Sequence, residues 1–156
     1  MSTTTTGFAH QRLDAFHAAM ELTVEVERIA AALPRGHADV KDQVRRAAAA
    51  TMRNISEGAN RWTPRDKAAR FVVARGECGE CDAALEMIQR LRLASGREVE
   101  ALRPIADRVG AMLTGLIKRQ QRADASGSPR TGLARPMHEL ARSRAVLARP
   151  RPRSLR

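Results

Sequence analysis

Four stretches of this 156-residue chain carry apolar residues at steps of three and four. That spacing places apolar side chains on one face of an α-helix. Residues that interrupt helices separate the stretches, namely Pro34 with Gly36, Pro64, and Gly96. Four helices joined by short connections pack as an antiparallel up-down-up-down bundle. The predicted fold class is therefore all-α, with one four-helix bundle as the single folded domain.

Composition agrees with helices and argues against a β-sandwich or barrel. Aromatic residues are only 3% of the chain, whereas strands favour aromatic and β-branched residues. Alanine, the best helix former, is abundant. No apolar run is long enough to span a membrane, and the N-terminal segment lacks the pattern of a secretory signal. Because two cysteines cannot form a disulfide framework, we expect a cytoplasmic protein that does not bind membranes.

The first predicted helix, residues 10–33, has two apolar stripes rather than one. A helix with two stripes is covered on two sides, by its own bundle or by another subunit. The predicted bundle therefore leaves apolar surface that self-association would cover. The first stripe contains Leu13, Phe16, Met20 and Val24, and the second contains Leu22, Val26, Ile29 and Leu33.

The second predicted helix, residues 37–61, has an apolar face that continues to Trp62. The third starts at Pro64, with Thr63 as its N-cap, and runs to about Ala94. Its two mid-helix glycines, 76 and 79, predict the close approach of a neighbouring helix. Its predicted inward face contains Ala68, Phe71, Val72, Cys78, Leu85, Ile88 and Leu91.

The fourth predicted helix follows a capping-box pattern from Ser95 to Glu98. Pro104 means either that this helix kinks or that it starts near Arg103. After residue 122 the chain is rich in arginine and proline. We therefore expect three segments: a flexible N-terminus at 1–9, the bundle at 10–122 and a mostly disordered basic tail at 123–156.

The exposed side of the second helix is basic, in a chain whose formal net charge is +11. Lysines and arginines that contact phosphates bind nucleic acid with little regard to sequence. The scarcity of aromatics argues against recognition by base stacking. The alternative interpretation is an ordinary solvated helix face, and the basic tail is either a second nucleic-acid arm or an extension without a role. The candidate nucleic-acid-binding residues are Lys41, Arg45, Arg46, Arg53, Arg61, Arg65, Lys67 and Arg70.

Four polar residues, Asn54, Glu57, Arg75 and Glu80, occupy helix faces that are expected to pack together. A buried carboxylate needs an arginine or a backbone partner. We therefore interpret these four as a structural polar network, in which the two glutamates pair with Arg61 and Arg75 within or between subunits.

The same residues make a poor metal or catalytic site. The Glu-x-x-His pattern of metal-binding bundles is absent, because Asn60 stands three residues after Glu57. Cys78 and Cys81 have no second pair and no histidine at ligand spacing, so we interpret them as core residues. No histidine is placed to activate a nucleophile. We predict no enzyme activity, no metal and no cofactor.

Three strings of the sequence resemble a known family. They are QVRRAAAATMRNISEGANR at 43–61, FVVARGECGEC at 71–81 and GAMLTGLIKR at 110–119. They are similar to the four-helix-bundle proteins encoded in intervening sequences of bacterial 23S ribosomal RNA genes. The accessory protein of diversity-generating retroelements is similar to that family as well. The resemblance covers about residues 10–121.

The resemblance implies a homo-oligomer, with a pentameric barrel in related proteins. It also implies a basic surface that binds nucleic acid or a reverse transcriptase. Ser56 and Glu77 depart from the family's motif, which has alanine and serine there. The residues that match the motif are Asn54, Glu57, Gly58 and Arg61 in the first string, and Phe71, Ala74, Arg75, Gly76 and Glu80 in the second.

Together these features predict a non-enzymatic, oligomeric bundle that binds RNA or an RNA–DNA hybrid. One such role would be that of an accessory factor of a reverse transcriptase. Two alternatives stay open. One is a protein–protein interaction module that recruits an acidic partner without nucleic acid. The other is a metal-dependent enzyme.

Overall fold

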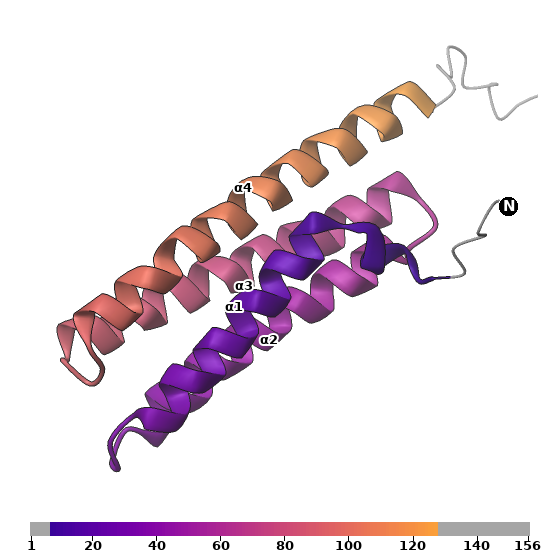
Figure 1. The fold of residues 1–156 in the computed structure, drawn as a ribbon. Helices are drawn as coiled ribbons and strands as arrows, with labels where there is room; N and C mark the ends of the chain where they lie inside the picture. Colours follow the sequence, from indigo (N-terminus) through magenta and orange to yellow (C-terminus); the bar gives the residue numbers. More distant parts are fainter. Residues whose placement is uncertain (1–6, 128–156) are drawn as a thin grey trace, which may run out of the picture.

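The structure, a computed structural model, describes residues 7–127 and contains four long helices (Figure 1). A single 3₁₀ turn, η1 (Ala9–Arg12), precedes α1 (Asp14–Ala32) and α2 (Ala38–Ala59). The chain continues through α3 (Pro64–Arg90) and α4 (Gly96–Gly127). Residues 1–6 and nearly all of the predicted basic tail, 128–156, lie outside the described residues.

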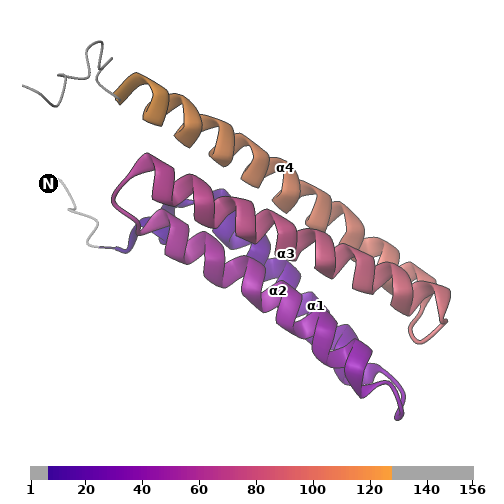
Figure 2. The ribbon, with the colours of Figure 1, turned by 180° about the vertical axis from the view of Figure 1, so that it is seen from behind.

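The helices form the antiparallel up-down-up-down bundle that the sequence predicts (Figures 1 and 2). Helix α1 packs against α2 and α4, and α3 packs against the same two helices. Within residues 7–127, α1 does not pack against α3, and α2 does not pack against α4. Helices α1 and α3 therefore stand at opposite corners of the bundle.

The core is one continuous cluster of apolar side chains from all four helices. Many of its members are alanines, which let the helices approach closely while larger side chains fill the space between them. Of the two stripes on α1, only the second belongs fully to this core, because Met20 and Val24 of the first remain exposed. The largest fully buried side chains are Phe71, Leu22, Ile55, Leu85, Ile88, Leu102, Leu113, Val26, Val44, Val99 and Val109.

The start of α3 is fixed by the cap that the sequence predicts. The side-chain oxygen of Thr63 accepts a hydrogen bond of 3.1 Å from the backbone N–H of Asp66. Its hydroxyl donates in turn to the Asp66 carboxylate, at 2.7 Å. Pro64 occupies the first helical position, where its missing N–H has no intrahelical acceptor to lose. The connection between α2 and α3 is therefore set locally.

Three helix ends differ from the predicted ones. The first helix begins only at Asp14, because Leu13 is extended and separates η1 from α1. Helix α3 ends at Arg90, and Arg92 then adopts the left-handed conformation (φ 55°). Helix α4 begins at Gly96 and runs past Pro104 to Gly127, beyond the predicted end near residue 122. Pro104 is exposed, so the backbone carbonyl that it leaves without a partner can be hydrated.

Three apolar residues that the pattern placed on inward faces lie outside the core. Val72 and Leu91 of the third segment are 53% and 52% exposed, and Trp62 is 96% exposed. Val72 directly follows the buried Phe71, so the helix turns it about 100° away from the core. Leu91 and Trp62 come after the last helical residues of α3 and α2, where the helical period no longer fixes the direction of a side chain.

The close approach of two helices occurs at a different glycine from the predicted ones. A Cβ atom at Gly76 or Gly79 would meet nothing within 4 Å. At Gly58 of α2, a Cβ would lie 2.8 Å from the Phe71 ring of α3. The absence of a side chain at Gly58 is therefore what lets α2 and α3 pack closely.

Candidate nucleic-acid interface

Three arginines of α2 line a shallow depression beside α1. Arg45, Arg46 and Arg53 surround a cavity of about 340 Å³ together with Glu27 and Asp42. The arginines occur at steps of one, seven and eight, which the 3.6-residue period places on one side of the helix. We call Arg45, Arg46 and Arg53 the α2 basic face.

The members of the α2 basic face differ in how freely they could contact a phosphate. Arg45 forms a two-point ion pair with Glu27 of α1, at 2.7 and 2.8 Å. The hydrogen bond from Arg45, aided by the charge of Lys41, lowers the pKa of the Glu27 carboxyl. Arg46 donates only to a backbone carbonyl, and Arg53 makes no ion pair with any described residue. Arg46 and Arg53 therefore offer the most accessible positive charge.

The predicted basic surface does not continue as one line along α3. Arg61 and Arg70 both pair with Glu57, with 3.2 Å between Arg70 Nε and the carboxylate. Lys67 instead lines a separate cleft beside η1 and α4. Arg65 is exposed in the first turn of α3. The eight predicted residues thus divide into the α2 basic face with its neighbour Lys41, a cluster around Glu57, and single residues elsewhere.

The four residues of the predicted polar network do not meet within one chain. Glu57 joins α2 to α3 through its ion pair with Arg70. Asn54 donates to the Ala50 carbonyl of its own helix, at 2.9 Å. Arg75 donates to Thr114 of α4, at 3.0 Å, and the exposed Glu80 makes no hydrogen bond within residues 7–127. Of the predicted pairs, Glu57 with Arg61 forms within the chain. The pair of Glu80 with Arg75 does not, because steps along α3 turn Arg75 towards α4 and Glu80 outwards.

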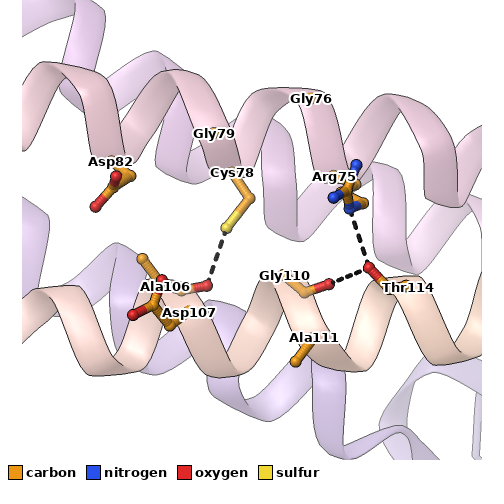
Figure 3. Close-up of a pocket in the computed structure, with 10 residues that line it drawn as sticks. All are labelled: Arg75, Gly76, Cys78, Gly79, Asp82, Ala106, Asp107, Gly110, Ala111 and Thr114. Atoms are coloured by element: carbon orange, nitrogen blue, oxygen red, sulfur yellow. Dashed lines mark hydrogen bonds between the residues drawn. The ribbon is translucent and has the colours of Figure 1, made fainter.

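A groove of about 590 Å³ separates α3 from α4 (Figure 3). The Cys78 thiol points into it and donates to the Ala106 carbonyl, with 3.4 Å between sulfur and oxygen. Burial raises the pKa of Cys78 to about 11 and that of Cys81 to about 12. Both thiols therefore keep their protons near neutral pH, unlike a reactive or metal-binding cysteine. Among the residues that the structure describes, no three His, Cys, Asp or Glu side chains come together as metal ligands.

The structure adds one residue to the candidate interface that sequence reasoning did not select. Trp62 stands almost fully exposed in the connection between α2 and α3, next to Arg61. An exposed indole can stack on a nucleobase, and a neighbouring arginine can bind the phosphate beside it. The signal available in the sequence was the position of Trp62 immediately before the Thr63 cap, outside either helix.

A family model now decides what kind of protein this is. The model of the 23S rRNA-intervening sequence protein matches residues 11–115, which is most of the chain. The chain belongs to that family. A crystal structure of a protein of unknown function from the S23 ribosomal protein family of Bacteroides thetaiotaomicron has a similar fold, with a TM-score of 0.63. The two sequences are 18% identical over 67% of this chain and 98% of the other. No curated protein matches the chain.

The residues that carry the resemblance to intervening-sequence proteins include the close contact between Gly58 and Phe71. Gly58 lies near the end of the first string and Phe71 begins the second, and the two residues touch where α2 meets α3. Glu57 and Arg70 form an ion pair beside them. This part of the motif therefore maintains the packing of the bundle. No described helix of this family member is long and apolar enough to cross a membrane.

Proposed function

We propose that this intervening-sequence family protein is a non-enzymatic, self-associating bundle that binds nucleic acid through its basic surface. The observation that carries the proposal is the α2 basic face, where three arginines stand together and two of them have no ion-pair partner among residues 7–127. Each phosphate that such a face contacts releases condensed counterions, so binding weakens steeply with salt. The positive net charge of the whole chain acts in the same direction.

Self-association follows from apolar surface on two opposite corners of the bundle. Met20 and Val24 are exposed on α1, and Val72 and Met87 are exposed on α3, where the exposed Ala83 lies between them. Because α1 and α3 are diagonal neighbours, these surfaces face away from each other. The α1 surface of one copy can therefore cover the α3 surface of the next. Head-to-tail contacts close into a ring when the rotation between copies closes, and the family resemblance favours a ring of five copies.

A ring supports nucleic-acid binding because it repeats the α2 basic face around one assembly. Several weak phosphate contacts then act together, since the second contact of a linked pair forms at high effective concentration. Contacts of this kind read the backbone and shape of a helix rather than its base sequence. We therefore expect duplex RNA or an RNA–DNA hybrid to bind with little sequence preference.

The test is an anisotropy titration of labelled RNA duplex with the triple variant Arg45→Glu, Arg46→Glu, Arg53→Glu. We expect an affinity loss of at least about tenfold and a shallower salt dependence. A matched control reverses three exposed arginines outside the α2 basic face, Arg35, Arg92 and Arg97, at the end of the bundle where α1 joins α2 and α3 joins α4. The control should bind nearly as the natural protein does. Equal binding by the two triple variants would contradict the proposal.

A further inference from the structure

A second basic site lies at the end of the bundle where η1, the start of α3 and the end of α4 meet. A cleft of about 280 Å³ opens there, and Arg12, Lys67 and Arg119 line it. The three side chains come from three different elements, η1, α3 and α4. They converge because the up-down topology returns the last helix to the end where the chain begins (Figure 2). We call this cavity, lined by Arg12, Lys67 and Arg119, the end cleft.

The three cations of the end cleft have no counter-ion inside the described part of the chain. None of them takes part in an ion pair, whereas seven other arginines within residues 7–127 do. No carboxylate lines the cleft itself, and Asp14 lies in an adjoining hollow. Like charges gathered in this way repel one another, so an anion in the cleft would stabilise the group.

The floor of the end cleft is apolar. Leu13, Phe71 and Leu116 line the cleft together with the cations. The adjoining hollow, of about 370 Å³, shares Arg12, Leu13, Leu116 and Arg119 with the cleft. It extends over Met112 and Gly115, and the missing side chain of Gly115 leaves open space, since a Cβ there would meet nothing within 4 Å. The site therefore joins a pocket for negative charge to an apolar shelf.

We propose that the end cleft binds the terminal phosphate of a nucleotide, with the sugar and base resting on the adjoining apolar shelf. The inference rests on the proposed function and adds to it a place for the end of a strand. A terminal phosphate monoester carries nearly two negative charges at neutral pH, whereas a phosphate inside a strand carries one. Three converging cations match the monoester better.

The chemistry fits a phosphorylated strand end and a free nucleotide equally, so the test separates the two sources. The probe is a short single-stranded RNA with a fluorophore on one terminus and either a phosphate or a hydroxyl on the other, prepared in both polarities. We expect the phosphorylated probe to bind about five- to tenfold more tightly, the gain typical of a charge-assisted contact. A nucleoside monophosphate that removes this preference would show that the free nucleotide also occupies the site.

Two variants assign the preference to the end cleft. Arg12→Gln with Arg119→Gln should abolish the difference between the two probes, whereas Arg35→Gln with Arg97→Gln removes equal charge at the opposite end and should retain it. Gly115→Leu fills the apolar shelf without changing any charge, and it should reduce the preference as well. Circular dichroism establishes that each variant keeps its helices.

The possible failures are distinct. If the natural protein binds both probes equally, or if the Arg12 and Arg119 variant keeps the preference, the end cleft is not a phosphate site and the α2 basic face is unaffected. If neither these strands nor the labelled RNA duplex binds while the nucleoside monophosphate still does, the proposed function fails and the cleft remains as a nucleotide site.

Discussion

Among the glycines of the four helices, Gly58 is the one at which an added Cβ would clash. A Cβ added at Gly58 would lie 2.8 Å from the Phe71 ring and 3.1 Å from the Cβ of Arg70, which leaves no room for a methyl group. We expect Gly58→Ala to destabilise the fold by about 1–3 kcal/mol, as overpacking of a core does. Urea denaturation followed by circular dichroism measures the change.

The control for Gly58 is Gly110 on α4, where a Cβ would meet nothing within 4 Å. Alanine is the better helix former, so Gly110→Ala should stabilise the protein by about 0.5–1 kcal/mol. If both substitutions shifted the unfolding midpoint in the same direction, the close packing of α2 against α3 would not explain the role of Gly58.

Because of the two buried thiols, we expect the stability of the fold to decrease at alkaline pH. Burial raises the pKa of Cys78 to about 11 and that of Cys81 to about 12, from an ordinary value of 9.0. The folded protein therefore keeps both protons at a pH where the unfolded chain has lost them. The contribution of the two protonated thiols to the free energy of unfolding is complete below pH 9. It is lost as the pH rises towards 11 and 12. Between about pH 8 and pH 10 we expect a loss of about 2–3 kcal/mol from these groups.

The variant Cys78→Ala with Cys81→Ala isolates this effect from the titration of lysines. Its stability should fall less than that of the natural protein over the same pH range, as measured by urea denaturation at each pH. Parallel curves for the two proteins would mean that the thiols are not desolvated in solution.

Prediction from sequence succeeds for residues whose direction the helical period sets and fails where the period ends. Val44 and Ile55 lie in the core as the pattern of α2 predicts. Trp62 was assigned to the same apolar face, but the helix ends at Ala59 and the indole turns to solvent. Residues in a connection take their direction from backbone angles that no periodic pattern encodes.

At the scale of helices, the ion pair between Glu27 and Arg45 couples packing to the proposed function. It links α1 to α2, and it also holds one arginine of the α2 basic face against a carboxylate. Removing the carboxylate with Glu27→Gln should lower the stability by less than about 1 kcal/mol, because both side chains are about half exposed to solvent. The same change should tighten RNA binding about two- to fivefold.

The matched control for Glu27 is Glu25, which pairs with Arg28 on the other side of α1. Glu25→Gln removes an equal charge away from the α2 basic face and should leave RNA affinity nearly unchanged. Anisotropy titrations at one salt concentration compare the two variants directly. Unchanged binding in Glu27→Gln would indicate that Arg45 does not contact the nucleic acid.

Element by element, local chemical signals were more informative than charge patterns. The Thr63 cap and the Pro64 start were readable because both act within four residues. The continuous basic surface was not, because Glu57 on α2 takes Arg70 of α3 into an ion pair. Partners on another helix depend on the packing angle and register of the two helices, which the sequence of either helix alone does not contain.

At the scale of the whole molecule, the two apolar corners make the proposed assembly testable. A glutamate in place of Val24 on α1, or of Ala83 on α3, would bring a charge into a contact between copies. We expect light scattering to show that each single variant fails to form the large assembly proposed for the natural protein. Ala101→Glu, at an exposed position of α4 away from both corners, should assemble as the natural protein does.

Mixing the two variants distinguishes head-to-tail contacts from a symmetric pairing of like surfaces. A Val24→Glu copy keeps an intact α3 surface, and an Ala83→Glu copy keeps an intact α1 surface. In a head-to-tail assembly the intact α3 surface of one variant binds the intact α1 surface of the other. The two surfaces that remain both carry a glutamate, so the mixture should form a dimer and no larger assembly. If like surfaces paired instead, each variant alone would still dimerise through its unaltered corner, and mixing would add no new species. The mass of the mixed species therefore reports the symmetry of the assembly.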